Sequence, residues 1–328
     1  MTPKSDEELV QLALTRDKLA VSTLVSLFED QREAAIARRA FVYERLAALR
    51  SGPNAIMLGV TGTPGAGKSS LLARTSLELL AMDQELSFAV LAIDPSSHVS
   101  GGSLLGDRTR MRLPNDERRV FFRSQASATE LGGLGPWSFQ VARLLALLFD
   151  CVIIETVGIG QSEADIRHLA DRVYLVLQPL AGDQVQFLKA GIMEVPHAFI
   201  LNKCDDPSAE RSYHTLRGSV GLARPWDGDR VAIYKTSART GQGIPELAAD
   251  MLEATRAQRS SGKPTLTTKE PYFFERWVRD EWGRFGLRHL DQALGGATAF
   301  LMRARSFEAA QAELTAALRG LTGGSSPA

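Results

Sequence analysis

Apolar residues in the first fifty positions recur at the spacing of an amphipathic helix. Leu9, Leu12 and later residues on the same stripe predict a helical hairpin packed against a neighbour. Ser5 and Glu8 fit a capping box, in which the serine hydroxyl and the glutamate carboxylate satisfy backbone N–H groups at a helix start. The sequence Ser-Gly-Pro-Asn at residues 51–54 then ends the helical pattern.

From residue 55 the pattern changes to short apolar runs separated by helix-length stretches. Such runs are typical of parallel strands that are buried on both faces and connected by helices. We therefore expect an α/β domain with a doubly wound, mostly parallel sheet. The predicted strands are residues 56–60, 88–93, 120–122, 151–154, 173–177, 198–201 and 231–234.

After about residue 255 the strand-like runs stop and the pattern becomes helical again. A linker at residues 260–264 precedes an aromatic helical segment and a second helix over about 306–318. We expect three parts: an N-terminal helical extension over 1–52, the α/β domain over 53–258, and a C-terminal helical arm over 259–328 whose tail, from residue 320, frays.

Composition and charge restrict the class of protein. The 38 basic and 38 acidic residues give a net charge of zero, which argues against a general nucleic-acid binder. Residues 51–255 carry 19 basic and 23 acidic groups, whereas residues 256–328 carry 11 and 7, so an acidic core is joined to a basic arm. Two cysteines, a polar N-terminus and no long apolar run predict no disulfide framework, no secretory signal and no membrane span, hence a cytoplasmic protein.

One glycine-rich segment matches the phosphate-binding loop G-x-x-x-x-G-K-[ST]. It follows the predicted strand at 56–60 and precedes a helical stretch, which is the context that the motif requires. Backbone N–H groups of such a loop face a phosphate, the lysine reaches the β- and γ-phosphates, and the serine binds Mg²⁺. The candidate residues are Gly62, Thr63, Pro64, Gly65, Ala66, Gly67, Lys68, Ser69 and the next residue, Ser70.

A second motif, Asn-Lys-x-Asp at residues 202–205, follows the predicted strand at 198–201. It resembles the guanine-recognition motif of GTPases, in which Asp205 accepts from the guanine N1–H and N2–H₂ groups that adenine lacks. Asn202 would tie this loop to the phosphate loop, and Lys203 would lie along the base. Further on, residues 236–239 include Ser237, Ala238 and Arg239 and look like the loop whose backbone contacts guanine O6, although Ser-Ala alone is a common pair.

Acidic residues at strand ends are candidates for holding Mg²⁺. Glu155 and Gly158 resemble the Asp-x-x-Gly switch of GTPases, with glutamate in place of aspartate and the Gly158 amide facing the γ-phosphate. The residue after Gly158 is Ile159 rather than the glutamine that orients the attacking water in Ras-like proteins, which predicts slow intrinsic hydrolysis. Asp94 and Asp107 could approach the metal, or could equally be helix caps.

Four segments stand out together: Asp-Pro-Ser-Ser at 94–97, Gly-Gly-Ser-Leu-Leu-Gly-Asp-Arg-Thr-Arg-Met at 101–111, Glu-Thr-Val-Gly-Ile-Gly-Gln-Ser-Glu at 155–163, and Asn-Lys-Cys-Asp at 202–205. With these segments the chain resembles the MeaB/ArgK/MMAA group of P-loop GTPases, which are chaperones of adenosylcobalamin-dependent acyl-CoA mutases. The resemblance covers nearly the whole chain.

The resemblance implies a P-loop GTPase that uses Mg²⁺ with GTP or GDP and binds no cobalamin itself. It implies that the chain gates transfer of adenosylcobalamin from an adenosyltransferase to a methylmalonyl-CoA-type mutase, and that it forms a homodimer through the C-terminal arm. Ser69, Asp94, Asp107 and Glu155 correspond to the metal and switch residues of the family. Gln184 and Lys189, in a further switch segment at 179–189, are candidates for coupling the mutase to hydrolysis.

Departures from the family pattern lie around the switches, at His98, Leu180 and residues 195–198. They leave the nucleotide motifs intact and bear on which mutase the chain serves. Two other functions compete with the chaperone. A nickel-delivery GTPase needs soft or imidazole ligands, but the five histidines are scattered and no Cys-His cluster exists in the sequence. A P-loop kinase needs no guanine-reading motif, which the segment 202–205 resembles.

Overall fold

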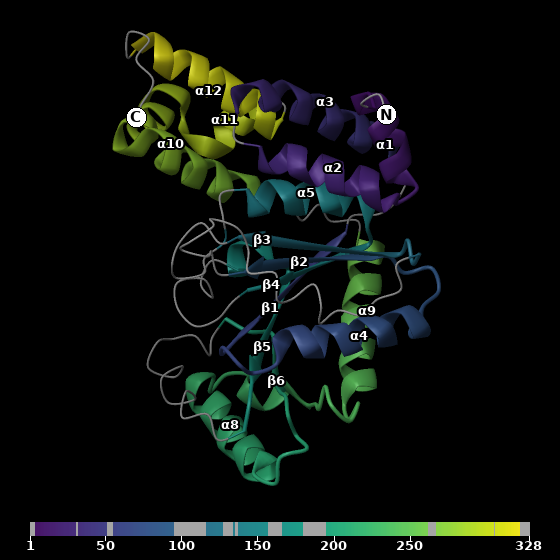
Figure 1. Cartoon of the computed structure of the whole chain (residues 1–328). Helices are drawn as coiled ribbons and strands as arrows, with labels where there is room; N and C mark the ends of the chain where they lie inside the picture. The colour runs from purple at the N-terminus through teal and green to yellow at the C-terminus, as the bar shows by residue number, and fades with distance from the viewer. Residues whose placement is uncertain are drawn as a thin grey trace, which may run out of the picture. The chain divides into compact units, whose positions relative to one another are not determined.

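The chain forms two compact units. A computed structural model describes residues 4–30, 32–50, 55–94, 116–126, 134, 137–156, 166–179, 195–261, 267–304 and 306–321. One unit, which we call the helical unit, comprises Met1–Gly52, Pro136–Leu148 and Lys263–Ala328. The other, which we call the sheet unit, comprises Pro53–Gly135 and Phe149–Gly262. Both units are shown in Figure 1, where the helical unit draws on the two ends of the chain and on one internal helix.

The sheet unit is built on a parallel sheet, as the short apolar runs predict. Within the described residues, the sheet has seven strands in the order β3-β2-β4-β1-β5-β6-β7, and every pairing is parallel (Figure 1). The strands are β1 Ile56–Gly62, β2 Phe88–Asp94, β3 Val120–Ala126, β4 Cys151–Glu155, β5 Arg172–Leu177, β6 Ala198–Leu201 and β7 Ala232–Lys235. This strand order reverses direction beside β1, and ligands of doubly wound sheets bind at the carboxyl ends of the strands at such a point.

Helices cover both faces of the sheet, which confirms the doubly wound class. On one face, α4 (Lys68–Met82) and α9 (Ile244–Ser261) pack on alternate residues of the strands, such as Leu58, Val90 and Ile153. On the other face, α8 (Ala209–Ala223) packs on residues of β5 and β6. Buried strands with apolar residues on both faces follow from this double cover.

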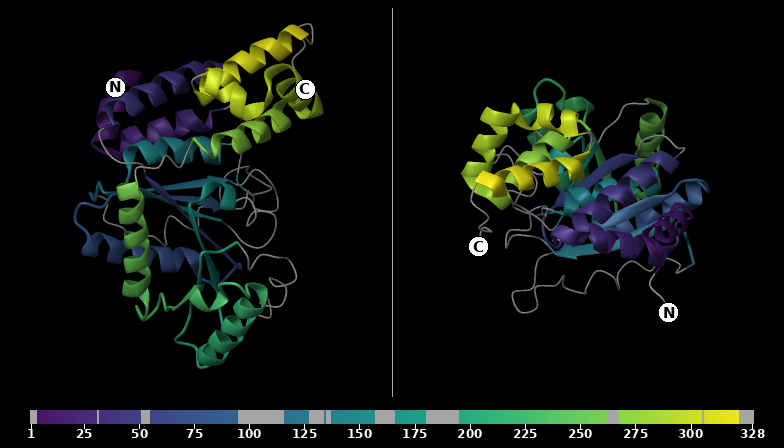
Figure 2. Two further views of the ribbon diagram at one scale, coloured as in Figure 1. Left: turned by 180° about the vertical axis from the view of Figure 1, so that it is seen from behind. Right: turned by 90° about the horizontal axis from the view of Figure 1, so that it is seen from above.

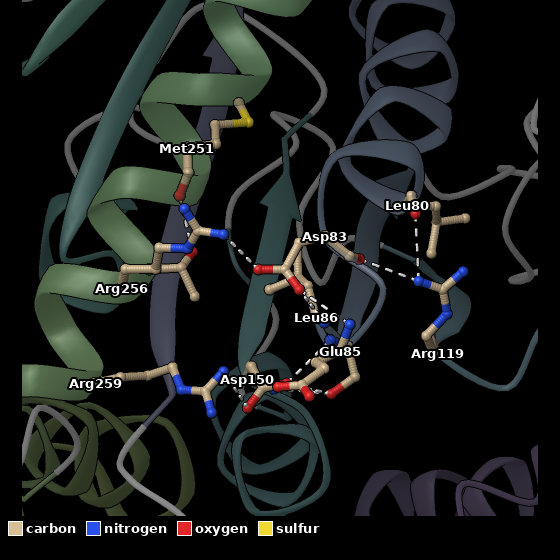
Figure 3. A network of polar contacts seen from close by, with 11 residues as sticks. Leu80, Asp83, Glu85, Leu86, Arg119, Asp150, Met251, Arg256 and Arg259 are labelled. Carbon is tan, nitrogen blue, oxygen red and sulfur yellow. Dashed lines mark hydrogen bonds and ion pairs between the residues drawn. The ribbon is translucent and has the colours of Figure 1, made fainter.

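A network of polar contacts ties the far ends of α4 and α9 to the sheet (Figure 3). The carboxylate of Asp83, which follows α4, accepts hydrogen bonds from the backbone N–H groups of Glu85 and Leu86. It also forms an ion pair with Arg256 of α9 at 2.8 Å. The backbone carbonyl of Asp83 also accepts from Arg119 at 3.1 Å. The network lies at the amino ends of β2 and β4, and so at the end of the sheet opposite the phosphate loop.

The helical unit brings the N-terminal and C-terminal segments side by side, as both views of Figure 2 show. Its helices are α1 Asp6–Leu14, α2 Lys18–Glu29, α3 Glu33–Leu49, α5 Ser138–Leu148, α10 Glu270–Leu294, α11 Gly296–Ala304 and α12 Phe307–Leu321. In α12 the apolar residues Phe307, Ala310, Leu314 and Leu318 are buried. At the start of α1 the predicted capping box between Ser5 and Glu8 is confirmed. Fraying was predicted from residue 320, but Gly320 and Leu321 belong to α12. The residues after Leu321 lie outside the described ones.

The predicted N-terminal hairpin is wrong in one respect, because three helices occupy this segment. Arg16 takes a left-handed backbone conformation with φ of 59°, which ends the first helix. Asp17 then caps α2 by accepting from the backbone N–H of Ala20 at 2.9 Å. The apolar residues keep their helical spacing across this break, so the spacing alone does not predict that the helix ends here.

Charged residues are buried at the centre of the helical unit. Arg143 of α5 is 1% exposed and forms ion pairs with Glu308 of α12 at 2.6 Å and Glu270 of α10 at 2.9 Å. Its guanidinium group also lies 4.0 Å from the ring centroid of Tyr43 on α3. Four helices from three segments of the chain therefore meet at one cation.

Within the described residues, no helix has the combination of length and apolar character that a bilayer-spanning helix requires.

Candidate nucleotide-binding site

The phosphate loop connects β1 to the start of α4. Gly62 has φ of 145°, and a Cβ atom there would lie 2.0 Å from the carbonyl oxygen of Val176, so the strand end needs a glycine. The side chain of Lys68 is buried and its Nζ donates to the carbonyl oxygens of Gly62 at 2.9 Å and Thr63 at 3.1 Å. The lysine is thus held over the loop whose backbone N–H groups are expected to face phosphate.

Asn202 joins the phosphate loop to the two loops that follow β6 and β7. Its side chain is buried, and its Nδ2 donates to the carbonyl oxygen of Ala66 at 2.8 Å. Its Oδ1 accepts from the backbone N–H of Ala238 at 3.2 Å and from the hydroxyl of Thr236 at 3.3 Å. A Cβ atom on Gly67 would lie 2.8 Å from Nδ2, so this close approach also depends on a glycine. The expected tie between the two motifs is present.

A pocket of about 650 Å³ opens between these loops. Asp205 lies in its wall, where one carboxylate oxygen accepts from the hydroxyl of Ser237 at 2.6 Å and the other pairs with Arg239 at 2.6 Å. The bond from Ser237, assisted by Arg239, holds the pKa of Asp205 below its ordinary value, so the carboxylate is ionised at neutral pH. The lining residues that were predicted from the sequence are Gly67, Ser70, Asn202, Lys203, Asp205, Ala238 and Arg239.

Lys203 has the backbone conformation of a constrained site. Its φ of 62° is unusual for a residue other than glycine, and its Nζ donates to the side-chain oxygen of Gln178 at 2.6 Å. Gln178 follows β5 and was not selected from the sequence, where no motif includes it. It links the segment after β5 to the loop of the predicted base site.

Two acidic residues end neighbouring strands near the start of α4. Glu155 ends β4, is buried, and accepts a hydrogen bond from the hydroxyl of Ser69 at 2.9 Å. Asp94 ends β2, is also buried, and accepts from the hydroxyl of Ser124 on β3. Serine hydroxyl and carboxylate oxygens are the ligand types that Mg²⁺ prefers, usually one or two from the protein together with phosphates and water.

Other predicted residues cannot be placed. Asp107, Gly158, Gln184 and Lys189 lie outside the described residues, as do the unusual positions His98 and Leu180. Within the described part of the chain, no group of three His, Cys, Asp or Glu side chains could hold a metal ion by itself.

The parallel sheet, the phosphate loop and the Asn202 tie define a P-loop GTPase fold. The chain belongs to the family described as methylmalonyl Co-A mutase-associated GTPase MeaB, whose model matches residues 21–281. A relative from Pyrococcus horikoshii is 37% identical over 262 residues, which are 78% of this chain and 80% of the relative. The GTPase ArgK of Escherichia coli is 35% identical over 246 residues, which are 72% of either chain.

A solved structure, that of an LAO/AO transport system kinase, resembles this chain with a TM-score of 0.61 at 22% identity, covering 100% of this chain and 95% of the other. At this identity the similarity supports the fold alone. The family membership, in contrast, assigns the chain to the GTPases and confirms the resemblance drawn from the motifs.

Proposed function

We propose that this chain is a GTP-hydrolysing chaperone that gates the loading, protection and repair of adenosylcobalamin in a methylmalonyl-CoA-type mutase. The family description, which names a mutase-associated GTPase, supports the partner. The observation that carries the nucleotide part is the arrangement around Asp205, whose ionised carboxylate faces a pocket that Asn202 joins to the phosphate loop.

Base selection follows from the hydrogen bonds that Asp205 can accept. Guanine offers N1–H and N2–H₂ donors to a carboxylate, whereas adenine offers neither at these positions. A base that covers this carboxylate without donating to it removes its hydrogen bonds with water and replaces none of them, which is costly, so a site built in this way rejects the wrong base. Arg239 and Ser237, which contact this carboxylate in the structure, would share it with the base or move aside.

Mg²⁺ fits the oxygen donors at the strand ends. Ser69 and Glu155 already lie within hydrogen-bond distance of one another, and Asp94 ends the neighbouring strand β2. When bound with the nucleotide, Mg²⁺ neutralises charge on the β- and γ-phosphates. Lys68 would hold the same phosphates, and Asp107, by the family resemblance, would belong to the same region.

Hydrolysis is proposed to be slow until the mutase binds. Ile159 stands where a water-orienting glutamine would be in a Ras-like protein. Gln184 and Lys189 are the proposed coupling residues by the resemblance stated above. Gln178 directly precedes their segment in the chain, and its side chain accepts a hydrogen bond from Lys203 of the base loop. This contact would connect the coupling segment to the nucleotide.

We also propose a homodimer formed through the C-terminal arm, with an adenosyltransferase as a second partner and no nucleic acid or membrane. Large apolar side chains on the arm support a contact surface. Phe285 of α10 is 48% exposed and Met302 of α11 is 79% exposed. Contiguous exposed apolar patches mark association surfaces, and we propose that these two side chains belong to one such patch.

The test is a nucleotide panel with and without a purified adenosylcobalamin-dependent acyl-CoA mutase. GTP, and not ATP, should be hydrolysed, and the mutase should raise the rate by at least about ten-fold, which corresponds to about 1.4 kcal/mol of barrier. Lys68→Ala serves as the control, because it removes the cation expected at the phosphates. Equal use of ATP, phosphate transfer to arginine, or undiminished turnover by Lys68→Ala would overturn the proposal.

A further inference from the structure

Three neighbouring strands change from apolar to polar at their carboxyl ends on one face of the sheet. Residues of β2, β3 and β4 that belong to the core under α4 and α9 alternate with residues of the opposite face, as in any strand. Following this alternation, Phe88 and Val90 of β2 lead to Asp94, and Cys151 and Ile153 of β4 lead to Glu155. The acids therefore occupy the face on which α4 begins.

The same alternation places Ser124 on that face. On β3, Val120 and Phe122 pack in the core under α4 and α9, and Ser124 is the next residue of the same parity. Ser124 pairs with Ala92 of β2, and Ala92 in turn pairs with Glu155 of β4. Asp94 lies two residues beyond Ala92 on the same face and pairs with Ala126 of β3, so Ser124 and Glu155 are diagonal neighbours of Asp94, one on each side.

From this position the Ser124 hydroxyl donates a hydrogen bond to Oδ2 of the buried Asp94. On the other side, the Ser69 hydroxyl donates to Glu155 at 2.9 Å. Each acid at the strand ends is thus held by a serine hydroxyl. One serine comes from the phosphate loop, and the other comes from β3, which lies at one end of the strand order.

We infer that Ser124 is a positioning residue for Asp94 in the Mg²⁺–nucleotide site. This inference rests on the proposed function, in which Asp94 serves the metal. A hydroxyl bond to one carboxylate oxygen fixes the rotamer of the acid and its direction, and loss of such a support typically lowers metal affinity by about 10–100-fold. The edge strand β3, which carries no nucleotide motif, thereby becomes part of the metal site.

A matched serine at the opposite end of the same strands provides the control. Ser87 donates its hydroxyl to Oδ2 of Asp150 at 2.7 Å and also its backbone N–H at 3.0 Å. Asp150 belongs to the polar network of Figure 3, at the amino ends of β2 and β4. Ser87→Ala removes the same type of bond from the same sheet, far from the phosphate loop along the strands.

The experiment measures binding of a fluorescent GDP or non-hydrolysable GTP analogue as a function of Mg²⁺ concentration, with Mn²⁺ binding by electron paramagnetic resonance as a second readout. Ser124→Ala should raise the half-saturating Mg²⁺ concentration by about ten-fold or more. Ser124→Thr, which keeps the hydroxyl, should stay within about two-fold of the wild type, and Ser87→Ala should leave the Mg²⁺ requirement unchanged while lowering stability.

An unchanged Mg²⁺ requirement in Ser124→Ala, or an equal rise in Ser87→Ala, overturns the inference. Where Ser124→Ala fails to fold, Ser124→Cys keeps the volume with a weaker donor, and a wild-type Mg²⁺ requirement in that variant also overturns it. The proposed function fails in a distinguishable way. In that case the wild-type chain itself would bind no guanine nucleotide in a Mg²⁺-dependent manner.

Discussion

Replacement of Arg143 by methionine is expected to destabilise the helical unit strongly. The substitution leaves Glu308, which is 0% exposed, and Glu270, which is 16% exposed, without the cation that both contact. Methionine has a similar length and fills the space, so the effect comes mainly from the uncompensated carboxylates. Breaking a buried ion pair by removing one partner typically costs about 3–5 kcal/mol of unfolding free energy.

The sign of the pH dependence follows from the carboxylates. Burial already raises the pKa of Glu270 above its ordinary value, against the opposing effect of Arg143. In Arg143→Met the folded-state pKa of Glu270 should rise further, because the opposing effect of Arg143 is removed, so that protonation of Glu270 favours the folded chain. The stability that the variant keeps at low pH is then lost as the pH rises, and the difference from the wild type should be larger at pH 8 than at pH 5.

The assay is denaturant unfolding followed by tryptophan fluorescence. Three of the four tryptophans, Trp137, Trp277 and Trp282, belong to the helical unit, so the signal reports mainly the transition of that unit. Nucleotide binding by the sheet unit is the control and should persist in the folded variant. The double variant Arg143→Met/Glu308→Leu should be less destabilised than Arg143→Met alone, because no buried charge is left at Glu308. A single-variant loss below about 1 kcal/mol, or a double variant worse than the single one, would refute the reasoning.

Three further outcomes are expected. Asp205→Asn should lower GTP affinity by about 100-fold or more, because bonds to a charged group contribute roughly 1.5–3 kcal/mol each, and should favour xanthosine nucleotides; unchanged base preference in competition binding would exclude Asp205 as the base reader. The His197 ring accepts the Val173 N–H at its Nδ1 (3.0 Å), and partial burial and two nearby arginines lower its pKa. Proton binding therefore favours the unfolded chain, so stability should fall as the pH drops through and below about 6.5, and His197→Gln should lose this component in denaturant titrations across pH. Phe285→Glu combined with Met302→Glu should give monomers in light scattering; an intact dimer would place the interface elsewhere.

Much of the fold could be predicted from local pattern. Buried parallel strands are continuous apolar runs, so all seven were found, and the phosphate loop was recognised because its glycines and lysine occur between a strand and a helix. The strand β3 was predicted too short, over residues 120–122, because it continues as Arg123, Ser124 and Gln125. Those polar residues end the apolar run while the backbone pairing continues to Ala126.

Features that depend on distant contacts could not be predicted. Ser124 has no motif, and its link to Asp94 appears only when β2 and β3 pair in register. Similarly, nothing near Arg143 in the sequence indicates that it will be buried against Glu308, 165 residues away. The internal helix α5 belongs to the same unit as the two chain ends. The expected domain limits, drawn along the sequence, included it in the α/β domain over 53–258.

The central claim is that this GTPase acts on an adenosylcobalamin-dependent acyl-CoA mutase. The most direct measurement is calorimetric binding of the purified chain to that mutase in the presence of GDP, a non-hydrolysable GTP analogue, or no nucleotide. We expect a complex whose affinity changes by about ten-fold or more between the two nucleotide states, and we expect this change to be lost in Lys68→Ala. Absence of a complex in every nucleotide state, or an affinity that is the same in all of them, would contradict it.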